Sequence, residues 1–295
     1  MGWVILSALC FGIMPVLAHV AYAAGMDPVT LLASRFLIAS ACMAPILWRH
    51  RSGIPQGRQL GILILMGGVG FVGEALAFFH ALEYASAGIV SLLLYLYPAI
   101  VALSSFLLFR EPLTLIKRVA LGMALVGVML TLGPLGASKP LGILLGLLSA
   151  IIYAGFVLGS GHLARFVDAR VSTAIVIMSA AAILTTLMLL RGPSFPSRLD
   201  GWLAAIALGT VSTVLAIMAF LIGVQKVGAV RAATIATVEP MVTVLTAAIF
   251  LDERLRLVQI IGGMFILGGM VVLVRFRDAS GPPLSEDDLL VSPRT

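Results

Sequence analysis

The chain has 295 residues and a formal net charge of +6, with 61% hydrophobic residues, only 11% charged ones and a mean hydropathy of +1.13. Soluble domains carry about 25% charged residues, so this composition excludes a soluble protein with a polar surface around its core. The positive charge does not indicate a nucleic-acid binder, because the basic residues fall in the links between apolar segments. Lipid is the solvent that remains, and there only helices and closed barrels satisfy their own backbone hydrogen bonds.

Ten apolar segments follow one another along the chain. Most run for roughly 17 to 22 residues, the length of a helix that crosses a ~30 Å bilayer core, whereas a barrel strand needs only about 10 residues of strict alternation. In chain order the predicted membrane spans are 3–22, 31–48, 60–80, 89–109, 119–133, 141–160, 171–190, 202–223, 230–250 and 257–274. The sequence therefore predicts an all-α polytopic membrane protein with ten transmembrane helices.

The orientation follows from the basic residues of the short loops, because cytoplasmic loops hold an excess of Lys and Arg. With the N-terminus inside, 13 of the 19 Lys and Arg residues fall on the cytoplasmic side and five on the outer side, while Arg35 lies within a span. We therefore expect a bacterial inner-membrane protein with both termini in the cytoplasm. The stretch 275–295 is polar, acidic and Pro-containing, and it is expected to be a disordered cytoplasmic tail.

The chain repeats itself weakly at a displacement of 142 residues. The pattern Pro-x12-Glu-x-Leu begins at Pro98 in the first half and at Pro240 in the second. The expected units are two five-helix repeats, residues 1–137 and 138–274. Because each unit has an odd number of spans, the second enters the membrane from the opposite side. The two repeats are therefore predicted to be inverted about an axis in the membrane plane, as in many secondary transporters.

Three prolines are candidate kinks or gating points: Pro15 in the first span, Pro98 in the fourth and Pro240 in the ninth. A proline inside a helix lacks an N–H group and clashes with the carbonyl group four residues earlier. Paired interruptions at matching positions of two repeats point to a transport site near the midplane, as at Pro98 and Pro240. The alternative is that they are packing kinks, which membrane helices tolerate.

Glu239 precedes Pro240 and lies at the expected depth of the membrane centre. A charged acid there costs roughly 2.5 to 3.5 kcal/mol on insertion scales. A wet cavity, a substrate ammonium group or protonation would offset this cost, and a protonated Glu239 bonded within the bundle is the structural alternative. The matching residue of the first half is Tyr97. The two halves are therefore expected to contribute different groups to one site.

The third helix offers a second acid. Glu74 and Phe78 are four residues apart and share a helix face, which His80 borders. Together with other aromatic residues they could line a cavity for planar or amphipathic small molecules, although packing is an equal alternative for the tyrosines. The full set of predicted substrate-binding residues is Glu74, Phe78, Phe79, His80, Tyr95, Tyr97, Pro98, Tyr153, Glu239 and Pro240.

Arg35 lies about one turn inside the outer end of the second span. Its side chain is expected to snorkel to the membrane surface. The alternative is that Arg35 pairs with Glu74 or with a substrate carboxylate at the outer side of the cavity.

Three classes of membrane protein are considered for the function: an enzyme, a channel and a secondary transporter. An enzyme would need a catalytic constellation, but the sequence has no HExxH, GxSxG or P-loop motif and no His and Cys cluster with metal spacing. A channel would be expected to show a filter sequence or charged rings, and neither is visible. A secondary transporter is therefore favoured. The expected partners are a small-molecule substrate and the lipid bilayer, with no cofactor, metal or nucleic acid and with the oligomeric state left open.

The repeated motif resembles the EamA-type branch of the drug/metabolite transporter superfamily. The residues that carry the resemblance are Pro98, Glu111 and Leu113, matched by Pro240, Glu253 and Leu255. Within that branch, the aromatic third and fourth helices make the chain similar to bacterial aromatic amino-acid exporters. The resemblance implies a central cavity that opens alternately to either side. The expected function is export of small amphipathic metabolites, most readily amino acids including aromatic ones, with efflux of lipophilic cations or drugs as the alternative and a membrane-embedded enzyme as a distant one.

Overall fold

The computed structural model describes residues 1–97, 99–100, 103–104, 115–132, 139–163, 167–227, 235–236, 238–252 and 256–275. The α-helices are α1 (Gly2–Gly12), α2 (Met14–Ala23), α3 (Pro28–Arg49), α4 (Arg58–Leu65), α5 (Val72–Ala81), α6 (Ala87–Leu94), α8 (Leu115–Leu132), α9 (Pro140–Leu163), α10 (Ala169–Arg191), α11 (Leu199–Gly209), α12 (Ala216–Val227), α14 (Glu239–Phe250) and α15 (Leu257–Arg275). Two π-helical segments, η2 (Met66–Phe71) and η3 (Thr210–Leu215), and a 3-10 turn, η1 (Arg51–Gly53), complete the set.

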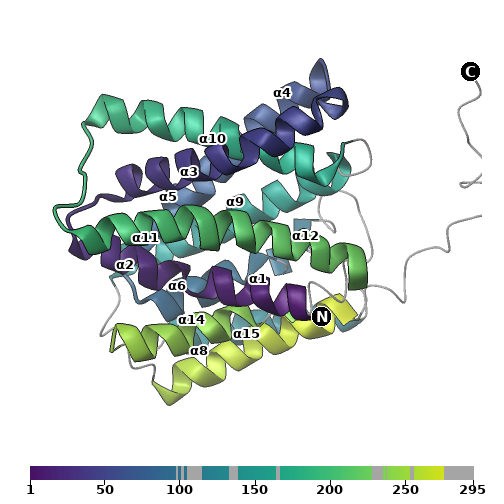
Figure 1. The fold of residues 1–295 in the computed structure, drawn as a ribbon. Coiled ribbons are helices and arrows are strands. Elements are labelled where there is room, and N and C mark those ends of the chain that lie inside the picture. Colours follow the sequence, from purple (N-terminus) through teal and green to yellow (C-terminus); the bar gives the residue numbers. More distant parts are fainter. Residues whose placement is uncertain are drawn as a thin grey trace, which may run out of the picture.

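The described residues form an all-helical bundle without strands, as expected for a membrane protein (Figure 1). Five stretches in this part are long and apolar enough to cross a membrane: Gly2–Ala23, Pro28–Arg49, Arg58–Ala81, Arg170–Arg191 and Leu199–Phe220. Shorter apolar helices cover parts of other expected spans. The helical membrane architecture is confirmed, while the count of ten stays a prediction.

Several sequence-based expectations lie outside the described residues. They concern Pro98, Glu111, Glu253 and the tail 276–295.

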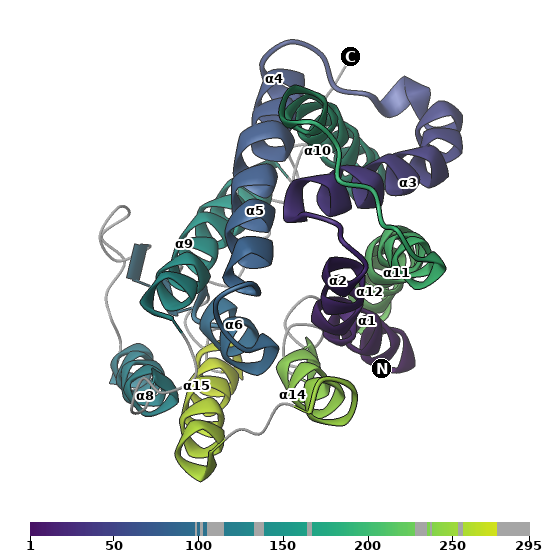
Figure 2. The ribbon, with the colours of Figure 1, turned by 90° about the vertical axis from the view of Figure 1, so that its left-hand side faces the viewer.

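Helices from the first half of the sequence pack against helices from the second half. The first expected span, α1 and α2, packs against α11, α12 and α14 of the second half. In the same way α9, the first helix of the second half, packs against η2, α5 and α6 of the first. Three further pairs of helices also join the halves, namely α3 with α10, α6 with α14 and α8 with α15. In the view turned by 90°, several of these helices are seen close to end-on (Figure 2).

Local sequence sets the beginning of individual helices. The Asp27 carboxylate accepts hydrogen bonds from the backbone N–H groups of Val29 and Thr30, and Pro28 occupies the first turn of α3. Burial would raise the pKa of Asp27, but a hydrogen bond from the Thr30 hydroxyl group and the two from the backbone outweigh it and hold the pKa below its ordinary value. In the same way, the Ser86 hydroxyl accepts from the N–H group of Ile89 and caps α6.

Helix interruptions occur near two of the three candidate prolines. The first span breaks at Ile13, and Pro15 lies in the first turn of the helix that follows. In the ninth expected span, α14 begins at Glu239 after a turn at Val238, and Pro240 lies in the first turn of this helix. The first half also has an interruption before position 98, because α6 ends at Leu94 and a turn follows.

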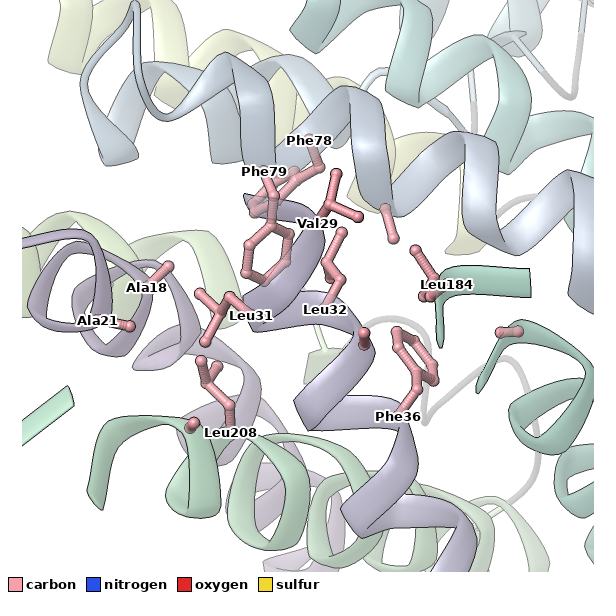
Figure 3. Close-up of a cluster of buried hydrophobic side chains, with 14 of the residues drawn as sticks. Ala18, Ala21, Val29, Leu31, Leu32, Phe36, Phe78, Phe79, Leu184 and Leu208 are labelled. Carbon is pink, nitrogen blue, oxygen red and sulfur yellow. The ribbon is translucent and has the colours of Figure 1, made fainter. Parts of the chain in front are cut away.

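A hydrophobic core joins α2, α3, α5, α10 and α11 (Figure 3). Phe36 and Phe79 are the largest fully buried side chains in it, and Leu31, Leu184 and Leu208 pack around them. Because lipid is as apolar as these side chains, close van der Waals packing rather than the hydrophobic effect holds the helices together here.

Close helix contacts require glycine at defined positions. A Cβ atom added to Gly67 of η2 would lie 2.5 Å from the carbonyl oxygen and 2.8 Å from the Cα atom of Val176 on α10. The backbone of α10 cannot move aside as a flexible side chain would. Gly61 lies six residues earlier, and a Cβ atom added there would meet no other atom within 4 Å.

We therefore expect Gly67→Ala to destabilise the protein by about 1 to 3 kcal/mol, because the added methyl group forces η2 and α10 apart. Gly61→Ala is the matched control and should be neutral or slightly stabilising, since it adds a methyl group to a helix without a clash. Thermal unfolding of both variants in detergent measures the difference. Equal unfolding temperatures would contradict the close approach of η2 to α10.

Candidate functional site

The first acid of the site, Glu239, is placed by the start of α14. Its side chain is half-buried and faces Tyr95, whose hydroxyl group interacts with the carboxyl group. The same hydroxyl donates to the carbonyl oxygen of Ala236 at 3.2 Å, just before the helix interruption. Glu239 is therefore held at a point where the backbone of the ninth span leaves its regular helix.

The second acid, Glu74, comes from α5 in the first half of the chain. It is 8% exposed, and its Oε1 atom accepts a hydrogen bond of 3.2 Å from the hydroxyl group of Ser149 on α9. Its carboxyl group also lies close enough to that of Glu239 for an electrostatic interaction. One acid from each half of the sequence therefore reaches a common region.

Three tyrosines accompany the two acids. The ring centroids of Tyr95 and Tyr97 lie 6.1 Å apart, and those of Tyr97 and Tyr153 lie 4.7 Å apart in an edge-to-face arrangement. Tyr153 in turn stacks on Phe156 at 6.1 Å with an interplanar angle of 10°. These rings come from α9 and the segment after α6, so the cluster also joins the two halves.

The row of rings continues away from the acids. Phe156 meets Phe71 edge-on at 5.5 Å, and Phe71 meets Phe36 of α3 edge-on at the same distance. Phe36 belongs to the core described above. The aromatic row therefore runs from Tyr95, beside Glu239, to the core around α3.

Phe78, Phe79 and His80 occupy a different environment from the tyrosines. Phe78 and Phe79 are 2% and 1% exposed and belong to the core of α2, α3, α5, α10 and α11. The Phe79 carbonyl oxygen accepts a hydrogen bond of 2.9 Å from the Tyr22 hydroxyl group. His80 is half-buried, and its Nδ1 atom lies 2.9 Å from the carbonyl oxygen of Leu76 on its own helix. The structure thus divides the predicted set into the acid and tyrosine cluster and a separate hydrophobic group.

The expectation that Arg35 snorkels to the membrane surface is wrong. The side chain is 4% exposed and points into the bundle, where its Nε atom donates a hydrogen bond of 2.7 Å to the Thr213 hydroxyl group. Its guanidinium carbon lies 5.2 Å from the ring centroid of Phe36 and 5.5 Å from that of Phe79. Arg35 also interacts electrostatically with Glu74.

Two polar residues of this region were not predicted as site residues. Ser149 is fully buried and bonds Glu74, while Thr213 bonds Arg35. The pair Ser149 and Ala150 matches Ser7 and Ala8 of the first half, a signal that could have identified Ser149. Thr213 carries no comparable signal, because its role depends on the packing of η3 against α3.

The cluster offers acidic groups, hydroxyl groups and aromatic faces, a combination suited to an organic molecule with a positive charge and an apolar part. Within the residues that the structure describes, no group of three or more His, Cys, Asp or Glu side chains could hold a metal ion.

Comparisons with known proteins agree with this reading of the bundle. An uncharacterized transporter, YcbK, from Bacillus subtilis is 29% identical over 91% of this chain and 91% of its own length. An uncharacterized transporter from Archaeoglobus fulgidus is 28% identical over 92% of this chain and 95% of its own length. A solved crystal structure with 22% identity has a TM-score of 0.69 and covers 95% of this chain and 98% of that chain, so it shares the fold.

A family model described as the EamA-like transporter family matches residues 1–133 and residues 140–275. Together these two stretches cover most of the chain. Their boundary falls between α8 and α9, where the second half of the sequence begins. The chain therefore belongs to the EamA-like transporter family of polytopic membrane proteins.

Proposed function

We propose that this membrane transporter exports small amphipathic metabolites, most readily amino acids including aromatic ones, by alternating access around the cluster of Glu74, Glu239 and the three tyrosines. The observation that carries the proposal is that these five side chains come from both halves of the sequence and interact with one another. A site built by two halves is opened to one side or the other when the halves rock. Its proposed location is the bacterial inner membrane, with both termini in the cytoplasm.

The proposed mechanism needs two inverted five-helix repeats, residues 1–137 and 138–274. The packing pattern supports them, because most contacts between the halves have a counterpart with the halves exchanged. The family model also matches the chain in two stretches, one in each proposed repeat. Both third helices of the repeats contain a π-helical segment, η2 in one and η3 in the other. An odd number of spans in each repeat then gives them opposite orientations.

The chemistry of the cluster favours a substrate with an ammonium group and a planar apolar part. A carboxylate accepts charge-assisted hydrogen bonds from an ammonium group, and aromatic rings pack edge-on or offset against a substrate ring. Tyr97 and Tyr153 already adopt the edge-to-face geometry with each other. An aromatic amino acid combines both features in one small molecule.

Efflux of lipophilic cations is the second candidate. The observation that favours it is that two acids interact electrostatically, since a bound cation would relieve the repulsion between their charged forms. A cation with a delocalised charge would also gain from the tyrosine faces.

The first test is the flux of labelled phenylalanine and tryptophan in proteoliposomes that contain the full chain. We expect uptake or efflux well above that of empty vesicles. The same panel includes a lipophilic cation, with and without a pH gradient. Amino-acid flux no different from that of empty vesicles would refute amino-acid export, and flux of the cation alone would favour the second candidate.

The second test replaces each acid by its neutral isostere. Glu239→Gln and Glu74→Gln should each lower phenylalanine flux about 10-fold or more, because a charge-assisted hydrogen bond contributes about 1.5 to 3 kcal/mol. Glu83→Gln is the matched control, since Glu83 is exposed and lies outside the cluster, and it should leave the flux unchanged. If Glu239→Gln abolished cation flux and spared amino-acid flux, Glu239 would be the site of the cation instead.

A further inference from the structure

Arg35 supplies a positive charge and N–H donors, which the acid and tyrosine cluster lacks. Its Nε atom donates to Thr213, and the Thr213 hydroxyl group donates in turn to the carbonyl oxygen of Leu208, each at 2.7 Å. In the described part of the chain, the two terminal nitrogens of Arg35 make no hydrogen bond. A guanidinium group has five N–H donors, so most of the donors of this buried side chain are free to bind an acceptor.

Among the residues that the structure describes, no anion is bonded directly to the guanidinium group of Arg35. A buried charge is normally paired, because transfer out of water is expensive. Glu74 interacts with Arg35 electrostatically, but among the described residues the two side chains do not approach within the 4.0 Å of an ion pair. The Glu74 carboxylate is instead hydrogen-bonded by Ser149. The guanidinium group also lies over the rings of Phe36 and Phe79, which are uncharged.

We infer that Arg35 binds the carboxylate group of the transported molecule. The two free terminal nitrogens form a planar fork that matches the two oxygens of a carboxylate. The substrate ammonium group then lies toward Glu74, and its apolar part lies on the end of the aromatic row formed by Phe36 and Phe71. This inference rests on the proposed function and narrows it, because it makes Arg35 the residue that selects zwitterions over amines.

The surroundings favour a carboxylate over a more highly charged anion. A phosphate dianion at Arg35 would be repelled by Glu74 and, beyond it, by Glu239. A zwitterion carries a positive charge of its own, which Glu74 attracts. The arrangement of one guanidinium group and a nearby carboxylate is therefore complementary to an amino acid.

The alternative is that Arg35 only links α3 to η3 through Thr213. Such a link would stabilise the bundle and would affect every substrate equally. A binding role is different, because it distinguishes molecules that carry a carboxylate from those that lack one.

The first experiment uses the purified full-length wild-type protein and phenylglyoxal, which modifies reachable guanidinium groups. Peptide mass spectrometry follows the modification of Arg35, with the exposed Arg198 as internal reference. Phenylalanine or phenylacetate should slow modification of Arg35 at least threefold, phenethylamine should not, and Arg198 should react equally in all samples. Absence of modification at Arg35, or equal rates with and without the carboxylates, would overturn the inference.

The second experiment compares the fluxes of phenylalanine and phenethylamine in proteoliposomes. Arg35→Gln should lower the ratio of phenylalanine flux to phenethylamine flux about 10-fold or more, and Arg35→Lys should lower it less because the charge is kept. Arg198→Gln removes an exposed guanidinium group outside this region and should leave the ratio within about twofold. A parallel fall of both fluxes in a folded Arg35→Gln protein would assign Arg35 to a structural role.

The two experiments separate this inference from the proposed function. Wild-type vesicles that transport neither probe would refute amino-acid export, while protection of Arg35 by phenylacetate would still establish its carboxylate site. Phenylalanine flux without any protection of Arg35 would leave export in place and overturn the role of Arg35. If Arg35→Gln does not fold, the labelling of the wild-type protein decides.

Discussion

Polar groups within a bilayer must find their partners inside the protein, because hydrocarbon offers none. The hydroxyl groups of Ser179 and Thr186 return to carbonyl oxygens four residues earlier on their own helix, at 2.7 and 2.9 Å. Where a helix is interrupted, side chains take over, as the Tyr95 hydroxyl group does at the Ala236 carbonyl. The charged groups follow the same constraint, so Arg35, Glu74 and Glu239 gather in one interior region. This interior region therefore brings together one guanidinium group and two acids.

The same constraint explains which features were predictable from the sequence. Apolar runs of membrane length predict helices with little ambiguity, because lipid permits few alternatives. Acids within such runs are rare, so Glu74 and Glu239 stand out as candidates, and the structure brings them together. The tyrosines are less distinctive, because aromatic residues also serve as packing and interface anchors. Their edge-to-face row becomes visible only when the fold places Tyr97 against Tyr153.

Tertiary packing decides the features that the sequence could not predict. Arg35 lies near a helix end, where snorkelling is the usual outcome, but α3 turns this face toward η3 and Thr213 receives the side chain. Phe78 is adjacent in sequence to Phe79 and shares a face with Glu74, yet both rings lie in the core. The two π-helical segments were not predicted either, since neither η2 nor η3 contains a proline that would indicate an irregular helix.

The two π-helical segments, η2 and η3, each contact a helix from the other half of the sequence. A π-helix leaves the regular i to i−4 pattern, and such bulges often occur at functional sites. In η3 the Thr213 hydroxyl group bonds the carbonyl oxygen of Leu208, five residues earlier, and also accepts from Arg35. In η2 the tight contact of Gly67 with α10 leaves no room for a side chain. Each segment therefore holds a third helix of one half against the second helix of the other, and η3 does so through Arg35. If the halves move against each other as we propose, the environment of Arg35 changes with them, so the carboxylate binding that we infer would be coupled to the change of access.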